Sequence, residues 1–324
     1  LYIIFFVTIA TTGNATDFGD MTFAHTQGTG CSNATRGLFF GGRAAPTNYN
    51  SIEFITIAST GDATDFGDLP STGNQANATA SQTRGVHVAG NPASAPLYQN
   101  NTMSFVTIAS TGNATDSGNL QSNHMGSVGL SNATRGIDAG GANPSKQDQI
   151  GYITMSSGGD FVDFGNLLSS VLAQGAVASP TRGIMTGGRI SDPAGFTDVM
   201  QFITIASTGN ASDFGDLTVA QAYQTGCSNS TRGVLSGGYS PSPSSYTTTS
   251  LIESVQIATL GDAIDYADLV AATNTMRAAS TPTRGFFAGG NTGSQTNTIQ
   301  FISFQTSGTA SDFGDLQNTA DELQ

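Results

Sequence analysis

Charged side chains are scarce in this sequence, and the shortage of basic ones excludes two classes of partner. Charged residues make up 10% of the 324-residue chain, well below the ~25% of an average protein. Ten Lys and Arg stand against 23 Asp and Glu, which gives a net charge of -13. A nucleic-acid-binding face needs clustered Lys and Arg to neutralise phosphates, and docking on anionic lipid needs the same residues. We therefore expect no nucleic-acid partner and no docking on an anionic membrane.

Cysteine is also scarce, and long apolar segments are missing. Cys31 and Cys227 are too few for a disulfide framework, and each is expected to be a small buried hydrophobe. No apolar stretch reaches the ~18 residues that cross a bilayer, so no membrane insertion is expected. Residues 1–10 lack the basic flank and cleavage site of a signal peptide and match a segment that recurs later. Because residue 1 is Leu, we expect the chain to begin inside a longer gene product.

Two short segments recur in phase along the whole chain. The first is Thr-Asp-Phe-Gly-Asp or a variant, and its first aspartate lies at Asp17, Asp65, Asp116, Asp163, Asp213, Asp265 and Asp312. The second is Thr-Arg-Gly, whose arginine lies at Arg36, Arg84, Arg135, Arg182, Arg232 and Arg284. Two series that advance together every 47–52 residues indicate a repeat of about 49 residues. The sequence therefore predicts one domain, 1–324, built of these units.

Each unit is predicted to form four short strands. In the unit at 69–120, the first strand ends near residue 81 and the second covers 83–90. The third strand covers 103–110 and the fourth covers 114–120. The third strand is rich in β-branched and aromatic residues, and the Thr-Gly-Asn at 111–113 suits a tight turn. No segment has sustained helical periodicity, and 41 glycines are too many for helix interiors. The 19 Phe and 8 Tyr recur at regular places, which favours a folded β protein over a disordered chain.

Four strands in a unit of about 49 residues are typical of a β-propeller blade. The units resemble kelch repeats, because paired glycines close the second strand at 41–42, 140–141, 187–188, 237–238 and 289–290. Ala89-Gly90 stands in the remaining unit, and no unit has the kelch tryptophan. Its approximate place is taken by Phe18, Phe66, Phe164, Phe214 and Phe313. The resemblance implies an all-β, kelch-like propeller.

The number of blades depends on how the ring closes. The sequence has seven third-plus-fourth strand pairs but only six first-plus-second pairs. Either seven four-stranded blades form, with N- and C-terminal strands closing the ring, or six blades close and one hairpin is spare. We favour seven, because an unclosed end exposes strand edges.

The repeated charged residues are expected to be structural. Each repeat arginine should pair with a repeat aspartate or cap backbone carbonyls between blades, since its planar fork offers five donors. The alternative is a ring of arginines that binds anions. Paired aspartates such as Asp17 and Asp20 suggest Ca²⁺, but two carboxylates fall short of the six to eight ligands that it takes. His25, His87 and His124 have no ligand spacing. We expect no catalytic residue, no metal and no cofactor.

Loops on one face of the propeller are the predicted binding site. The first-to-second and third-to-fourth turns are nearly uniform between units, whereas the second-to-third and fourth-to-first loops vary and share the opposite face. Binding residues are commonly carried by variable loops on a rigid frame, and aromatic-plus-polar loops suit sugars or protein surfaces. The candidates are Arg43, Tyr49, Tyr98, Lys146, Arg189, Phe196, Tyr239 and Tyr246. The alternative is that these loops are solvated connectors.

A second resemblance concerns function. The phrase Ile-Thr-Ile-Ala-Ser-Thr-Gly-Asn-Ala-Thr-Asp-Phe-Gly-Asp-Leu occurs with one substitution each at 55–69 and 203–217. It is similar to the propeller-type repeats of tailed-bacteriophage virion proteins: tail fibres, adhesins and decoration proteins. This resemblance implies a non-enzymatic structural or adhesion protein at the virion surface, whose partners are other virion proteins, further copies of itself or host surface glycans. A secreted or surface lectin-like bacterial propeller and a glycan-active enzyme are the alternatives.

Overall fold

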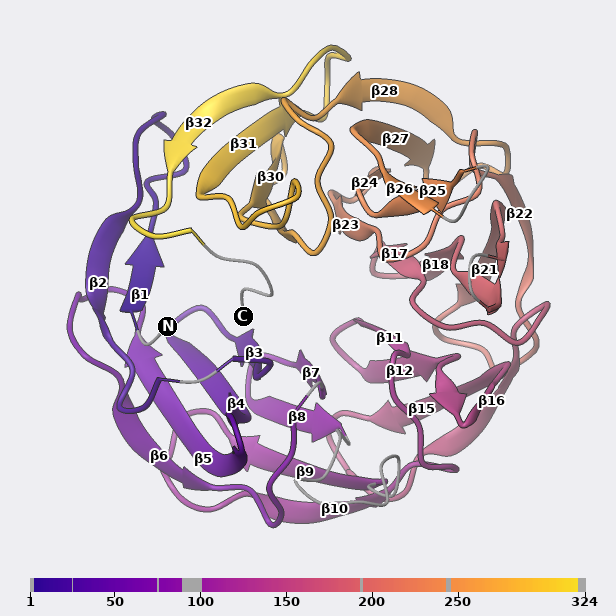
Figure 1. The fold of residues 1–324 in the computed structure, drawn as a ribbon. Helices are drawn as coiled ribbons and strands as arrows, with labels where there is room; N and C mark the ends of the chain where they lie inside the picture. Colours follow the sequence, from indigo (N-terminus) through magenta and orange to yellow (C-terminus); the bar gives the residue numbers. More distant parts are fainter. Residues whose placement is uncertain are drawn as a thin grey trace.

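Antiparallel sheets are arranged around a central axis in a closed ring (Figure 1). The structure is a computed structural model that describes residues 3–24, 26–74, 76–88, 101–192, 195–242 and 246–319. Within these ranges every regular element is a β-strand, and no helix is long and apolar enough to cross a membrane. The chain is thus an all-β propeller.

Six four-stranded sheets, here called blades 1 to 6, follow one another along the chain. Blades 1 to 3 contain β3 (Thr29–Ser32), β4 (Arg36–Ala44), β5 (Thr47–Thr56) and β6 (Thr64–Asp68); β7 (Asn77–Ala80), β8 (Arg84–Val88), β9 (Thr102–Thr107) and β10 (Thr115–Asn119); and β11 (Val128–Ser131), β12 (Arg135–Ala139), β15 (Gln149–Thr154) and β16 (Val162–Asn166). Blades 4 to 6 contain β17 (Gly175–Ala178), β18 (Arg182–Thr186), β21 (Val199–Thr204) and β22 (Ser212–Asp216); β23 (Thr225–Ser228), β24 (Arg232–Ser236), β27 (Leu251–Gln256) and β28 (Ile264–Asp268); and β29 (Arg277–Ser280), β30 (Arg284–Ala288), β31 (Thr298–Ser303) and β32 (Ser311–Asp315). The first strand of each blade lies nearest the axis and the fourth lies at the rim (Figure 1).

Four two-stranded sheets complete the fold. The N-terminal hairpin pairs β1 (Ile3–Phe6) with β2 (Thr16–Asp20). The other three are small hairpins in the second-to-third loops of blades 3, 4 and 5. They are β13 (Ala142–Asn143) with β14 (Ser145–Lys146), β19 (Arg189–Ser191) with β20 (Gly195–Phe196), and β25 (Tyr239–Pro241) with β26 (Tyr246–Thr248).

Backbone hydrogen bonds close the ring at its rim. Between the hairpin and blade 1, Gly61 N–H donates to the Phe18 carbonyl at 2.7 Å, and the Ala63 N–H donates to the Asp20 carbonyl at 2.8 Å. The same two bonds recur at every junction, so that the third-to-fourth turn of each blade is tied to the outer strand of the blade before it. They also join β32 to the hairpin, where Gly13 N–H donates to the Phe313 carbonyl at 2.7 Å. The ring therefore has seven junctions.

The expectation of seven four-stranded blades is wrong, because the structure has six. The seventh repeat contributes only the N-terminal hairpin, which takes a place in the ring between blade 6 and blade 1 (Figure 1). The physical reason lies in the junctions. Their hydrogen bonds use only the third and fourth strands, so a hairpin of those two strands can close the circle without an inner pair.

The hydrophobic core is divided among the junctions. Seven clusters of buried side chains each span two neighbours in the ring. The cluster between blades 5 and 6, for example, contains Phe287 at 0% exposure and Ile252 at 0%. No blade can bury its own two faces, so its neighbours supply the cover, as expected of a repeat protein. This packing makes the frame rigid and leaves the loops free to differ.

Candidate functional site

In the part of the chain that the structure describes, the variable loops of five blades lie on one face. Bridges between single residues join the fourth-to-first loop to the start of the second-to-third loop in five blades. The pairs are Thr26 with Arg43, Met125 with Ala142, Leu172 with Arg189, Ala222 with Tyr239, and Asn274 with Asn291. Both loop types are therefore held together next to the paired glycines. We call this side of the molecule the variable face.

Four of the predicted binding residues come together on the variable face, at the boundary between blades 4 and 5. Arg189 and Phe196 come from the small hairpin β19–β20, and Tyr239 and Tyr246 come from β25–β26. With Tyr223 they line a cavity of about 190 Å³, which we call the aromatic pocket.

The rings of the aromatic pocket meet mostly edge to face. Tyr239 is at the centre: its ring centroid lies 4.7 Å from that of Tyr246 and 5.8 Å from that of Tyr223, at interplanar angles of 63° and 84°. Phe196 lies 6.4 Å from Tyr246. Burial raises the pKa of the Tyr239 hydroxyl, and the neighbouring hydroxyls of Tyr246 and Tyr223 add to the effect. Tyr246 is 48% exposed and Tyr223 is 41% exposed, so two aromatic surfaces in the pocket remain available to a ligand.

Two of the few basic side chains of the protein form ion pairs at the edge of this pocket. Lys146 Nζ lies 3.0 Å from Asp192 Oδ2, and the Arg189 guanidinium contacts the other carboxylate oxygen. The hydrogen bond from Lys146 lowers the pKa of Asp192, and the positive charge of Arg189 acts in the same direction. Lys146 belongs to blade 3, so the ion-pair group joins the loops of blades 3 and 4. It fixes Arg189 at the edge of the aromatic pocket.

Tyr223 is the pocket residue that sequence reasoning missed. It has a positive φ of 60° in the fourth-to-first loop of blade 4. Gln27, Ala173 and Thr275 have nearly the same φ, between 55° and 57°, in the corresponding loops. The left-handed backbone is therefore a property of the repeat and not of the site. A comparison of this loop position between units would have found an aromatic side chain among small and polar ones.

The remaining candidates for binding lie elsewhere. Tyr49, in β5 of blade 1, stacks on Phe23 with ring centroids 5.4 Å apart. Arg43 is exposed at the end of β4, and neither lines the aromatic pocket. Tyr98 lies outside the described residues. The predicted binding residues that the structure describes thus fall into two groups. One lies in and around the aromatic pocket, and the other is the pair Arg43 and Tyr49 in blade 1.

The six repeat arginines lie over aromatic rings. Each guanidinium carbon is 4.0–4.8 Å from a ring centroid, and the rings belong to Phe54, Phe105, Tyr152, Phe202, Tyr266 and Phe301. Five of them also donate from Nη1 to a carbonyl of the next unit in the ring; the acceptors are Ile108, Ile205, Ile257, Phe304 and Ile9. Each of these arginines thus ties one junction of the ring.

The repeat aspartates lie in the outer strands and are exposed. Five of them accept a hydrogen bond from the backbone N–H two residues later, at a register shift of the strand; they are Asp17, Asp65, Asp116, Asp213 and Asp312. Among the described residues no group of three or more His, Cys, Asp or Glu side chains has a geometry that could hold a metal ion.

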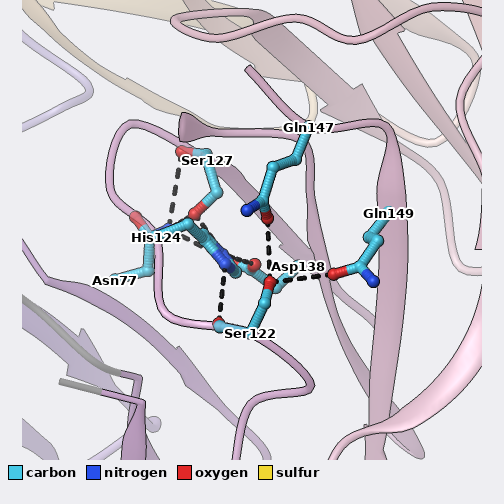
Figure 2. Close-up of polar contacts among 7 residues, drawn as sticks. All are labelled: Asn77, Ser122, His124, Ser127, Asp138, Gln147 and Gln149. Carbon is cyan, nitrogen blue, oxygen red and sulfur yellow. Dashed lines mark hydrogen bonds and ion pairs between the residues drawn. The ribbon is translucent and has the colours of Figure 1, made fainter. Parts of the chain in front are cut away.

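A buried polar cluster in blade 3 includes the side chains that most resemble catalytic machinery (Figure 2). His124 Nε2 lies 2.6 Å from Asp138 Oδ2, and Ser127 Oγ donates to the other Asp138 oxygen at 2.8 Å. The second ring nitrogen of His124 faces the Ser122 carbonyl at 3.0 Å. Because both nitrogens are engaged and the serine points to the carboxylate, the imidazole has no free base to activate Ser127. The arrangement suits structure better than nucleophilic catalysis.

Cys227 is buried and Cys31 is half-buried, and both are free thiols. Burial raises the pKa of each thiol to about 12. A neutral thiol is a poor nucleophile, so neither cysteine suits a reactive role.

Two buried glutamates tie the fourth-to-first loops to the next blade. Glu253 is 0% exposed, and its Oε1 accepts from the Thr218 backbone at 2.6 Å and from the Thr218 hydroxyl at 2.7 Å. Glu53 accepts from Thr22 in the same way. At the equivalent place Gln201 and Gln300 accept from the backbone of Leu168 and Val270. The repeat therefore needs a side-chain oxygen here and not a negative charge.

We expect Glu253→Gln to be tolerated and to remove a pH dependence. Burial raises the pKa of Glu253, so the wild-type protein loses stability as pH rises from 4.5 through the folded-state pKa. Relative to wild type, the variant should therefore gain stability between pH 4.5 and pH 8. Urea denaturation of both proteins at the two pH values measures this difference. An equal difference at both, or the same pH dependence for the exposed control Asp163→Asn, would contradict it.

Comparison with known proteins locates this chain by fold alone. No protein-family model and no curated protein matches the sequence. Among solved structures, 498 chains match. A structure of YjhT aligns with a TM-score of 0.69 and 10% sequence identity over 90% of this chain and 98% of that one. At this identity the likeness shows the propeller fold, and because one fold serves many functions, it assigns no activity.

Proposed function

We propose that this protein is a non-enzymatic adhesion propeller of a virion surface, and that it binds surface glycans through the aromatic pocket. The observation that carries the proposal is the pocket itself. Four variable-loop residues that the sequence predicts as binding residues line one cavity of about 190 Å³. The uniform frame supports this reading, because the repeat holds the loops while their sequences differ. Binding, rather than catalysis, is favoured by the fully engaged His124.

The chemistry of the aromatic pocket suits a sugar. Exposed tyrosine faces pack against the C–H face of a pyranose ring, while their hydroxyls and the Arg189 guanidinium offer hydrogen bonds to sugar hydroxyls. Tyr246 and Tyr239 stand at 63° to one another, which gives two walls to a bound ring. The net charge of -13 disfavours non-specific capture of anions, so recognition must depend on local contacts.

The finer family assignment belongs to the same proposal. Paired glycines at the end of the second strand support a kelch-like repeat, and the phrase at 55–69 and 203–217 supports kinship with tailed-phage virion propellers. A surface rich in Ser, Thr, Asn and Gly fits a durable extracellular particle. In such a particle the opposite, uniform face is free to contact other virion proteins.

We expect Tyr246→Ala to weaken glycan binding about two- to tenfold, because one aromatic stack contributes roughly 0.5–1.5 kcal/mol. A glycan array first identifies a ligand for the wild-type protein, and titration calorimetry then compares the variants. Tyr49→Ala is the matched control, since it removes a tyrosine of the variable face in blade 1, away from the aromatic pocket. Its affinity should stay unchanged.

Two results would reject the proposal. One is the absence of any glycan bound by the wild-type protein, together with burial of the aromatic pocket against another virion chain in the assembled particle, which would favour pure scaffolding. The other is an equal loss of affinity in Tyr246→Ala and Tyr49→Ala.

A further inference from the structure

The ion-pair group at the edge of the aromatic pocket carries an excess of positive charge. Lys146 and Arg189 both contact the carboxylate of Asp192, so two cations share one anion. The side chains of Lys146 and Arg189 are 13% and 24% exposed, whereas that of Asp192 is 68% exposed. The two positive groups are therefore fixed beside the pocket while their common counter-ion faces water. This local excess stands out in a chain whose net charge is -13.

Acidic side chains are scarce around the cavity. Besides the members of the ion-pair group, Asp198 is the one charged residue in the chain segments that carry the lining residues, which are 189–198, 218–224 and 239–248. Asp198 is exposed. Burial raises the pKa of Asp216 in the outer strand β22, and the negative charge of Asp198 adds to this effect. Asp198 thus faces the outer strand, and no carboxylate is among the described residues that line the cavity.

The polar groups of the lining are mainly hydrogen-bond donors. Arg189 has five N–H donors and no acceptor. Within the described part of the chain its Nη2 contacts Asp192, and its Nε is buried without a hydrogen-bond partner. The other polar side chains of the described lining are three tyrosines, whose hydroxyls both donate and accept. A neutral sugar presents hydroxyls that need acceptors as well as donors, whereas an ionised carboxylate only accepts. The lining therefore suits an acceptor-only group.

The size of the cavity limits the ligand to one small unit. Its volume is about 190 Å³, below the ~300–1,000 Å³ of pockets that enclose drug-sized molecules. A single sugar residue at the end of a glycan chain meets this limit. Its ring can pack on the exposed faces of Tyr223 and Tyr246, and the planar guanidinium of Arg189 matches the geometry of a carboxylate.

We infer that the aromatic pocket selects a terminal sugar residue that carries a carboxylate, a hexuronic acid, and that Arg189 recognises the acidic group. This inference rests on the proposed function, because it names the class of glycan that the same site binds. The guanidinium donates to the carboxylate of the ligand while the tyrosine rings pack on the sugar. Asp192 orients the guanidinium, and Lys146 orients Asp192 from blade 3, so these two are positioning residues.

An array of glycans that end in matched pairs tests the class of ligand. The members of a pair differ only at the exocyclic carbon, which is a hydroxymethyl group in glucose, galactose or mannose and a carboxylate in the corresponding uronic acid. We expect the full chain to bind the acidic member of at least one pair about tenfold or more tightly, the gain expected of a hydrogen bond to a charged group. Titration calorimetry then compares the methyl glycoside of that acid with its uncharged amide, which has nearly the same shape.

Substitutions of Arg189 test which residue recognises the acid. Arg189→Gln should abolish the preference for the acidic member and leave the weaker binding of the neutral member unchanged. Arg189→Lys keeps the charge but not the planar fork, so it should retain part of the preference, and it covers the case in which the glutamine variant does not fold. Arg43→Gln is the matched control, because it removes an exposed arginine of the variable face in blade 1, and it should keep the full preference.

The outcomes separate this inference from the function on which it rests. Equal or tighter binding of the neutral sugars overturns the inference and leaves glycan binding in place. Binding of no glycan on the array overturns both. A preference for the acid that Arg189→Gln retains shows that another residue recognises the carboxylate and overturns the assignment. Equal loss of acidic and neutral binding in folded Arg189 variants also overturns it, because Arg189 would then shape the pocket without recognising the acid.

Discussion

Replacing Asp138 by alanine is expected to lower the free energy of unfolding by about 3–5 kcal/mol, because it breaks a buried pair and orphans its partners. Asp138 is 4% exposed. Its carboxylate accepts from Ser127 Oγ at 2.8 Å and from Asn77 at 3.3 Å and lies 2.6 Å from His124 Nε2 (Figure 2). Asn77 belongs to β7 of blade 2, so the loss spreads across a junction. Urea denaturation of the two proteins measures the difference.

The effect of Asp138→Ala should grow as pH falls. Burial opposes protonation of His124, but the hydrogen bond and negative charge of Asp138 outweigh it, so the pKa of His124 is raised above 6.5. A histidine with a raised folded-state pKa stabilises the protein below the unfolded-state pKa, and this contribution is lost as pH rises through the folded-state value. Wild type and variant should therefore differ more at pH 5.5 than at pH 8.5. Asp163→Ala, at an exposed repeat aspartate, should change stability by less than about 0.5 kcal/mol at either pH. A pH-independent difference would mean that His124 stays neutral in the folded protein.

The propeller fold was predictable from the sequence because the same pattern of strand and turn residues recurs in every unit. Spacings of 47–52 residues and the alternation of strand and turn residues appear in every unit, so the all-β propeller fold followed from comparison of the chain with itself. The number of blades did not follow. Counting strand pairs treats inner and outer pairs as equally necessary, whereas the hydrogen bonds at Gly61 and Gly13 close the ring through outer pairs alone.

The candidate site was predictable in part. Differences between units pointed to Arg189, Phe196, Tyr239 and Tyr246, and these four lie together. Arg43 and Tyr49 lie apart from these four residues. Their distance depends on which blades are neighbours and on how the small hairpins fold, and the type of a residue predicts neither. Nor does the spacing of 14 residues between His124 and Asp138 form a recognisable motif. Their contact arises only because a fourth-to-first loop folds back over β12.

We expect Arg182→Ala to cost about 2–4 kcal/mol of unfolding free energy, because it removes two interactions at the junction of blades 4 and 5. The guanidinium lies 4.5 Å from the Phe202 ring centroid, a cation–π contact that contributes roughly 0.5–2 kcal/mol. Its Nη1 donates to the Ile257 carbonyl at 2.8 Å. Ile257 is 1% exposed, so loss of the donor leaves a buried acceptor unsatisfied, which costs about 1–3 kcal/mol.

Arg182→Lys separates the two interactions, and Arg43→Ala controls for loss of a positive charge. Lysine keeps the charge over Phe202, but its single nitrogen cannot lie over the ring and reach the Ile257 carbonyl with the fork geometry of arginine. We therefore expect Arg182→Lys to recover less than half of the stability lost in Arg182→Ala. Arg43 is exposed and its side chain lies at the end of β4, so its removal should stay within about 0.5 kcal/mol of wild type. Full recovery of stability in Arg182→Lys would show that positive charge alone stabilises the junction. A loss of stability in Arg43→Ala as large as that in Arg182→Ala would show that net charge, and not the contact, determines stability. Because the same contact recurs at four further junctions, the result for Arg182 bears on how the whole ring resists opening.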